Sequence, residues 1–287
     1  MLVSMTDLTK YNGEKCILDH IELHIEDKDK VGILGVNGTG KSTLLKIIAG
    51  IEEYQGKISY QKDIRINYLP QTPLYNENDS IMETVYKQLD SKEIHDYEIK
   101  AQLGKFGIID ETQKIKELSG GQLKRVALAI ALIKPCDLLI LDEPFSGLDP
   151  INVELFKKEI LELKEKGTSI IFSSHRMEHV ELFCEKLVVL VKGKTVLNGY
   201  LKDIKKEYKK KDVYIIGDVV KEDLEKIEGV VKVRKENDNY IVTISDEKHV
   251  SRLFNYVKKC DNIIRFSVEE PSLNEIFIEK VGNAYDK

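Results

Sequence analysis

Two glycine-rich segments hold the residues best suited to phosphate chemistry. Residues 35–43 read Gly-Val-Asn-Gly-Thr-Gly-Lys-Ser-Thr, which fits the phosphate-cradling pattern G-x-x-x-x-G-K-[ST]. Residues 118–122 read Leu-Ser-Gly-Gly-Gln, a second glycine turn that opens a helix and can also hold phosphate. The chain therefore has one complete nucleotide-holding loop. Its second turn is most useful if it closes over a nucleotide held by another subunit.

The residue types of the first segment account for its chemistry. Gly35, Gly38 and Gly40 let backbone N–H groups curl round a polyphosphate without a Cβ in the way. Lys41 would neutralise the β- and γ-phosphates, and the Ser42 hydroxyl would bind Mg²⁺. The residues expected to contact the nucleotide in this loop are Gly35, Val36, Asn37, Gly38, Thr39, Gly40, Lys41, Ser42 and Thr43.

Buried strands and a helix must position these groups. The apolar run at residues 31–34 predicts a strand, and residues 41–49 have the spacing of a helix. Residues 137–144 read Asp-Leu-Leu-Ile-Leu-Asp-Glu-Pro, a run typical of a parallel strand buried on both faces. Ligands of α/β sheets bind at the carboxyl ends of strands. We therefore expect Asp142 to hold Mg²⁺ and Glu143 to orient or deprotonate water for attack on the γ-phosphate.

With these motifs in this order, the chain resembles the ATP-binding subunit of ATP-binding-cassette (ABC) proteins over about residues 1–205. The resemblance implies a head-to-tail pair of ATPase subunits that holds ATP and Mg²⁺ at its interface. It assigns adenine stacking to Tyr11, contact with Mg²⁺ and sensing of the transport partner to Gln71, and a γ-phosphate switch to His175. The signature turn matches Ser119, Gly120, Gly121 and Gln122, and the loop crossing the dimer interface matches residues 146–149, which end at Asp149.

Three of these residues also fit plainer roles. A lone Tyr11 can be a packing residue, and Gln71 can be a surface turn residue after Pro70. His175 and His179 lie four residues apart, as a zinc pair would, although no third ligand is spaced near them. The position of each residue within the family pattern favours the nucleotide roles.

The resemblance is not uniform along the chain. Residues 34–50 and 120–129 resemble ABC-F proteins, which are soluble tandem ATPases, many of them acting on the ribosome. From residues 143–150, Glu-Pro-Phe-Ser-Gly-Leu-Asp-Pro, onward the chain resembles ATPase subunits of exporters instead. One phosphate loop, one signature turn and no long charged linker weigh against a ribosomal role. A soluble ABC-F-like ATPase that acts on the ribosome or another macromolecule stays open as the alternative.

Composition limits the partners and the compartment. The formal net charge of −5 and the pI near 5.8 argue against direct nucleic-acid binding. The sequence has no positive, apolar N-terminal segment and no apolar run of roughly 20 residues, so we expect neither a signal peptide nor a bilayer span. The four cysteines lack metal spacing and fit a reducing cytosol. We therefore expect a cytoplasmic protein, peripheral on the inner face of the cell membrane.

Two domains are expected, because 287 residues are near the limit for one hydrophobic core. Residues 1–207 would form an α/β P-loop NTPase of the ABC type, with a helical subdomain at about residues 72–134. The six lysines of residues 202–211 indicate a solvated helix and linker, or alternatively attraction to anionic lipid. Residues 208–287 have elements in the order βαββαβ, which suits a small ferredoxin-like accessory domain, and end in a helix at 272–281.

The predicted function follows from these parts. We expect an ATP-binding and ATP-hydrolysing subunit that energises an ABC transporter of the exporter type. Its partners would be a second ATPase subunit, identical or related, and an integral membrane permease. Residues 270–277 resemble the ending of accessory domains on exporter ATPases, which adds to this prediction.

Overall fold

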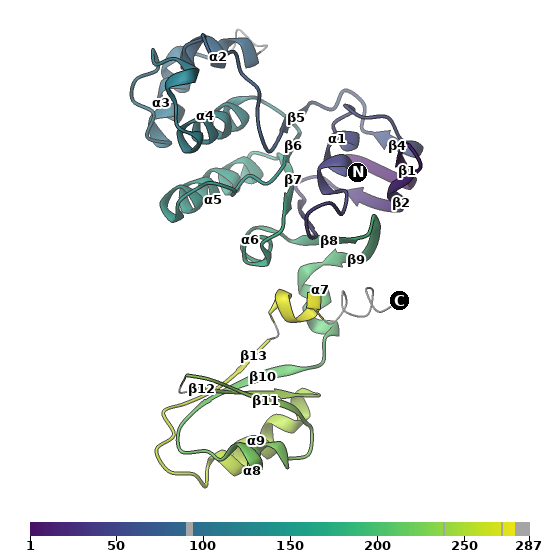
Figure 1. The fold of residues 1–287 in the computed structure, drawn as a ribbon, viewed down its shortest axis with the longest axis vertical. Helices are drawn as coiled ribbons and strands as arrows, with labels where there is room; N and C mark the ends of the chain where they lie inside the picture. The colour runs from purple at the N-terminus through teal and green to yellow at the C-terminus, as the bar shows by residue number, and fades with distance from the viewer. Residues whose placement is uncertain (90–93, 238, 271, 279–287) are drawn as a thin grey trace. The chain divides into compact units, whose positions relative to one another are not determined.

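The computed structural model describes residues 1–89, 94–237, 239–270 and 272–278 (Figure 1). The chain divides into two compact units, Met1–Gly199 and Tyr200–Lys287. The sequence-based boundary after residue 207 falls behind helix α7 (Leu201–Glu207), which the structure groups with the second unit. The lysine run at 202–211 predicted a solvated helix and linker; residues 201–207 are helical, and the helix buries Leu201 and Ile204.

A six-stranded sheet forms the centre of the first unit. In sheet order its strands are β5 (Ile66–Leu69), β6 (Leu138–Leu141), β7 (Ser169–Ser174), β3 (Lys30–Leu34), β8 (Lys186–Val191) and β9 (Lys194–Tyr200). Strands β5, β6, β7, β3 and β8 pair in parallel. Every residue of β6 and β7 is buried, as a parallel strand covered on both faces requires. The strands predicted within residues 31–34 and 137–144 are thus confirmed, as β3 and β6.

The first unit also contains a three-stranded antiparallel sheet, built from the first part of the chain. Its order is β2 (Lys15–Ile25), β1 (Val3–Asn12) and β4 (Gln55–Tyr60). Helix α1 (Lys41–Ile48) shares one apolar core with this sheet and with the central one; its buried members include Met5, Leu8, Ile21, Leu44, Ile48, Leu138 and Ile171. The core therefore fixes the start of α1, and with it the phosphate loop, against both sheets.

Helices α2 (Ile81–Gln88), α3 (Asp96–Lys105) and α4 (Gly120–Ile133) contact one another and lie in the part of the chain for which a helical subdomain is predicted (Figure 1). A reciprocal pair of hydrogen bonds between Ser80 and Glu83 begins α2. Apolar residues recur at helical spacing in this part of the sequence and are buried, namely Ile81, Val85, Leu89, Ile99, Leu103 and Phe106. The helix expected to open at the glycine turn of residues 118–122 begins at Gly120, because Ser119 is its cap.

Three further elements complete the first unit. A short 3₁₀ helix, η1 (Ile115–Glu117), precedes α4. Helix α5 (Pro150–Glu165) follows the acidic end of β6, and α6 (Met177–Phe183) follows the end of β7. Both helices therefore begin just after segments expected to contact nucleotide.

The second unit contains a four-stranded antiparallel sheet with the predicted ferredoxin-like topology. Its elements in chain order are β10 (Lys211–Ile216), α8 (Lys221–Glu225), β11 (Val230–Glu236), β12 (Asn239–Ile244), η2 (Glu247–His249), α9 (Val250–Val257) and β13 (Arg265–Glu269). The sheet order is β11-β12-β10-β13, so the first strand, β10, lies inside the sheet and pairs with both β12 and the last strand, β13. Residues 273–278 are helical, and the predicted remainder to 281 lies outside the described residues.

Candidate nucleotide-binding site

The phosphate loop lies between a buried strand and a helix, as its sequence predicts. Strand β3 ends at Leu34 and α1 begins at Lys41, with Gly40 as its N-cap. Gly38 and Gly40 have φ of 81° and 99°, a region that favours glycine. A Cβ on Gly40 would also lie 2.7 Å from Leu18 Cδ2. The backbone path round the loop therefore depends on glycine at this position.

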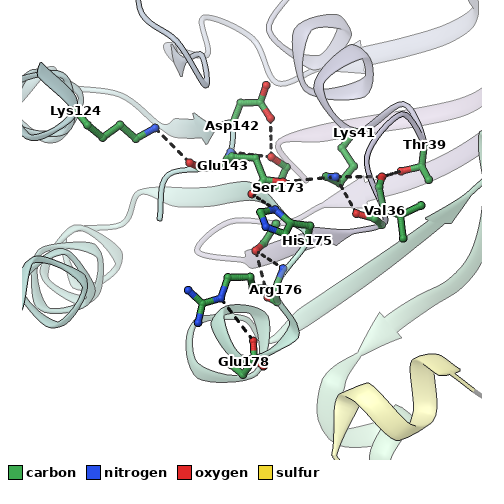
Figure 2. A network of polar contacts seen from close by, with 12 residues as sticks. Val36, Thr39, Lys41, Lys124, Asp142, Glu143, Ser173, His175, Arg176 and Glu178 are labelled. Atoms are coloured by element: carbon green, nitrogen blue, oxygen red, sulfur yellow. Dashed lines mark hydrogen bonds and ion pairs between the residues drawn. The ribbon is translucent and has the colours of Figure 1, made fainter. Parts of the chain in front are cut away.

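Lys41 is held inside the loop rather than extended into solvent. Its ammonium donates to the Gly35 carbonyl at 2.8 Å and to the Val36 carbonyl at 3.3 Å (Figure 2). The hydroxyl of Thr39 also donates to the Val36 carbonyl. The side chain of Lys41 is 6% exposed and lies 3.5 Å from Glu143 Oε1. The Lys41 ammonium thus lies between the loop and the acidic end of β6.

Ser173 organises the two acids that follow β6. Its buried hydroxyl donates to Asp142 Oδ1 at 2.6 Å and accepts the Glu143 N–H at 2.9 Å (Figure 2). Since β6 and β7 are paired neighbours, the end of β7 can bridge both residues. The orientation of the acids is therefore set by an adjacent strand as well as by their own.

Lys124 fixes the same segment from the helical subdomain. Its ammonium, on α4, donates to the Glu143 carbonyl at 3.2 Å and to the Gln71 carbonyl at 3.5 Å. Burial lowers the pKa of Lys124, and the nearby Asp142 and Glu143 oppose that change. The ammonium therefore links the loop after β5 to the acidic loop after β6.

Glu143 has an uncommon backbone conformation. Its φ is 46°, an uncommon value for a residue other than glycine, and such backbone strain concentrates at functional sites. Carboxylate Oε2 lies 3.0 Å from His175 Nδ1, while Oε1 is buried and has no hydrogen-bond partner among the described residues. The carboxylate is thus positioned by His175 and Lys41 and keeps accepting capacity on one oxygen.

These groups border a cleft of about 460 Å³. The predicted residues that line it are Asn37, Gly38, Gly40, Lys41, Ser42, Thr43, Gln71, Glu143 and His175. Three other loop residues make contacts within the loop instead. The carbonyls of Gly35 and Val36 accept from Lys41, and the Thr39 hydroxyl donates to the Val36 carbonyl. Tyr11 is 48% exposed and is not among the lining residues, whereas Lys15 and Ile17 are. Sequence reasoning missed these two; their place just after the turn that follows Tyr11 was the available signal.

The signature residues border a different cleft, of about 130 Å³. Its lining comprises Ser119, Gly121, Gln122, Arg125, Gly147, Leu148, Asp149 and Asn152. Ser119 and Gln122 close a capping box at the start of α4, so the glycines lie at a helix N-terminus. Asp149 caps α5, and hydrogen bonds from Asn152 lower the pKa of its carboxyl. The two clefts share no lining residue. The signature turn of this chain therefore does not line the 460 Å³ cleft of the same chain.

The described residues give no support to a zinc pair. They contain no cluster of three or more His, Cys, Asp or Glu suited to a metal ion. His179 is buried against Phe145, with ring centroids 4.3 Å apart, and burial lowers its pKa. None of the helices in the described ranges is both long and apolar enough to cross a membrane.

Family models match both parts of the chain. Residues 18–146 match the model described as ABC transporter, and residues 199–281 match the model for the C-terminal domain of DrrA1-3-like ATP-binding proteins. The chain is also similar to a solved structure of an ATP-binding subunit of an ABC transporter. The TM-score is 0.67 at 26% identity, over 72% of this chain and 93% of that one. The predicted α/β ABC fold is thereby confirmed.

Two similar proteins align over nearly their whole lengths. The ABC transporter ATP-binding protein YhaQ of Bacillus subtilis (strain 168) is 38% identical over 99% of this chain and 100% of its own length. The ABC transporter ATP-binding protein BpOF4_11395 of Alkalihalophilus pseudofirmus is 40% identical over 88% of this chain and 100% of its own length. The phosphate loop, the acidic strand end and these similarities agree, and the chain belongs to the family of ABC transporter ATP-binding proteins.

Proposed function

We propose that this chain hydrolyses ATP and that the hydrolysis drives a membrane permease working as an exporter. The placement of Glu143 carries the hydrolytic part of the proposal. Its carboxylate lies between His175, 3.0 Å away, and Lys41, 3.5 Å away, at the wall of the larger cleft. A fixed carboxylate beside a phosphate-binding lysine is what a water-activating base needs.

The residues beside Glu143 fit ATP with Mg²⁺. Ser42, Gln71 and Asp142 offer hydroxyl, amide and carboxylate oxygens, the ligand type that Mg²⁺ prefers. Asp142 is 3% exposed. Ser173 donates to its Oδ1, so the other carboxylate oxygen takes no part in that hydrogen bond. Bound Mg²⁺ would supply positive charge to the phosphate oxygens.

In the proposed reaction, the Glu143 carboxylate accepts a proton from the attacking water. Lys41 supplies positive charge to the cleft, and the N–H groups of the loop supply hydrogen-bond donors. Together they hold the phosphates. His175 orients Glu143 through its Nδ1 contact and faces the cleft where the γ-phosphate would lie. Each step uses a side chain already placed at the cleft.

A second subunit completes the proposed site. The signature turn lies at a separate cleft, with Ser119 and Gln122 capping α4 at its rim. Two chains arranged head to tail would set the turn of one over the nucleotide in the large cleft of the other. This arrangement gives the second phosphate-binding turn a ligand.

The exporter assignment rests on sequence features rather than on the nucleotide cleft. Residues 143–150 and 270–277 resemble exporter ATPases. The second unit matches the DrrA1-3-like C-terminal domain. The subunit would work in the cytoplasm at the inner face of the membrane, bound to its permease.

Glu143→Gln tests the chemistry, because an amide cannot accept the proton of the attacking water. We expect ATP binding to persist and hydrolysis to fall by ~10²–10⁴-fold. Phosphate release and nucleotide binding are measured on the same preparations. The control Glu222→Gln makes the same change on an exposed residue of α8 and should leave turnover intact. A Glu143 variant that keeps most of its turnover removes Glu143 from the catalytic role.

Ser119→Arg tests the head-to-tail arrangement. With ATP and Mg²⁺, the Glu143→Gln chain should shift to twice the monomer mass in light scattering, because unhydrolysed ATP holds the dimer. Adding Ser119→Arg should abolish the shift, since the larger side chain fills the signature turn, while ATP still binds to the monomer. Equal dimerisation with and without Ser119→Arg contradicts the arrangement.

Copurification tests the membrane partner. The chain extracted from detergent-solubilised membranes should bring a multi-span permease with it. Sedimentation with ribosomes in place of a permease would support the ABC-F-like alternative and refute the exporter proposal.

A further inference from the structure

The second unit contains a cleft that the nucleotide chemistry does not use. It has a volume of about 280 Å³ and is bounded by β10, β11, β12 and the helix at residues 273–278. Ligand pockets usually range from about 300 to 1,000 Å³, so this cleft suits a small molecule. Its lining contains four cations and two carboxylates, and the carboxylates are Asp212 and Glu275.

Both carboxylates are already satisfied inside the protein. Asp212 accepts the Thr243 hydroxyl at 2.5 Å and the Arg234 guanidinium at 3.2 Å. The same Arg234 nitrogen donates to Glu275 at 2.7 Å. This network ties the helix at residues 273–278 to the sheet. Both carboxylates thus have hydrogen-bond donors within the second unit, and the Arg234 guanidinium offsets one of the two negative charges.

The lining keeps a net positive charge, because its four cations outnumber its two carboxylates. Lys232, which lies exposed on β11, makes no ion pair within the described residues. Arg234 Nε is buried and has no hydrogen-bond partner in that part of the chain. Lys211 lies 3.5 Å from Glu270, which is outside the lining. The exposed ammonium of Lys232 is therefore available to an anion in the cleft.

Apolar side chains flank this charge. Val231 and Ile278 are 55% and 61% exposed, and both line the cleft with the ring of Tyr208. Apolar walls around a few convergent polar groups are the usual make-up of a small-molecule site. An inorganic anion would leave these walls in water, whereas a molecule with one charge and an apolar body would cover them.

We propose that this cleft binds a small amphiphilic organic anion. The acidic group, a carboxylate, phosphate or sulfonate, would lie against Lys232 and Arg234, and the apolar body against Val231, Ile278 and Tyr208. Since the ligand would contact β11 and the 273–278 helix together, binding would stabilise the packing of that helix on the sheet. A soluble aromatic acid and a lipid-derived fatty acid share this chemistry.

The test uses the full chain and 8-anilinonaphthalene-1-sulfonate, an anion with an aromatic body whose fluorescence rises on binding. The nucleotide cleft is first saturated with ADP and Mg²⁺. We expect saturable binding of one molecule per chain. Lys232→Glu should weaken it roughly tenfold, the scale of one lost hydrogen bond to a charged group. The control Lys235→Glu makes the same charge change on the same strand outside the cleft and should alter the affinity less than about twofold.

Competition identifies the kind of anion. At constant ionic strength, octanoate or 1-naphthoate should displace the probe, and inorganic phosphate should not. Stronger displacement by octanoate indicates a lipid-derived ligand, and stronger displacement by 1-naphthoate indicates a soluble aromatic acid. Absence of saturable binding, equal weakening by Lys232→Glu and Lys235→Glu, or equal displacement by inorganic phosphate would each overturn the proposal.

Discussion

Replacing Ser173 with alanine would separate the two acids from the strand that orients them. The hydroxyl of Ser173 donates to Asp142 Oδ1 and accepts the Glu143 N–H, and the residue is fully buried. Ser173→Ala removes both contacts without adding bulk. The change therefore perturbs the acidic loop while leaving the ligand-facing side chains of the cleft in place.

The size of the effect follows from these two hydrogen bonds. A hydrogen bond to a charged group contributes about 1.5–3 kcal/mol, and a buried donor left unpaired costs about 1–3 kcal/mol. Because Asp142 and Glu143 are adjacent, the two losses share relaxation and do not add fully. We expect the free energy of unfolding to fall by about 2–4 kcal/mol, which leaves a typical domain folded.

The loss should also appear in catalysis. A carboxylate of Asp142 released from Ser173 samples more orientations, so the Mg²⁺ concentration giving half-maximal ATP turnover should rise several-fold, and turnover at saturating Mg²⁺ should fall roughly tenfold. Urea unfolding of the first unit and phosphate release across a Mg²⁺ titration measure the two effects.

Ser174→Ala is the matched control. Ser174 is 1% exposed, and its hydroxyl bonds only with the backbone of Arg176 among the described residues. It should cost less stability and leave the Mg²⁺ dependence unchanged. If Ser173→Ala and Ser174→Ala show the same stability and the same Mg²⁺ titration, the positioning argument for Ser173 is refuted.

Three further predictions address other parts of the chain. Tyr11→Ala should weaken ATP binding by at least about fivefold in a fluorescence titration if the ring stacks on adenine, since stacking is worth about 1–3 kcal/mol per base; unchanged affinity contradicts stacking. Burial, and then a hydrogen bond with Glu275, raises the pKa of Asp212 to about 6, so the folded chain retains a proton there that the unfolded chain releases near pH 4. The thermal midpoint of the second unit should therefore fall as pH rises from about 4.5 to 6, and Asp212→Asn should flatten that slope; an unchanged slope contradicts the assignment. A chain ending at Gly199 should fold and bind ATP with modestly altered hydrolysis, because the nucleotide cleft lies within the first compact unit; an insoluble product contradicts this independence.

The pH range in which Asp212 alone changes the stability of this pair depends on its neighbour, Glu275. Burial acts to raise the pKa of Glu275, but hydrogen bonds with Asp212 and Arg234 lower it overall. Its stabilising contribution is therefore lost only as pH falls below its ordinary range, about 4.3. Between about pH 4.5 and 6 the change in stability from this pair reflects the Asp212 carboxyl.

Local patterns were sufficient to predict most of the fold. The continuous apolar run of β6, the spacing of Ile81 and Val85, and the capping-box spacing at Ser272 each have one dominant physical solution. The order βαββαβ in the second unit likewise leaves few ways to cover one sheet face with two helices. These elements depend on neighbours in the sequence, which the sequence displays directly.

Residues brought in from distant elements could not be predicted in the same way. Ser173 reads as a polar residue at a strand end, and its contact with Asp142 depends on β7 pairing with β6. The missing information there is the order of strands in the central sheet, which local spacing does not encode. Lys15 and Ile17 line the cleft from β2, and their closeness to Tyr11 in the sequence was the one local signal for them.

Lys124 shows how the two clefts of one chain are connected. The residue lies five positions after Ser119 on the same helix, so the helix transmits any displacement of the signature turn along its axis. Its ammonium contacts the carbonyls of Gln71 and Glu143. A partner bound at the signature turn would therefore act, through α4 and this buried ammonium, on the backbone that presents the proposed base.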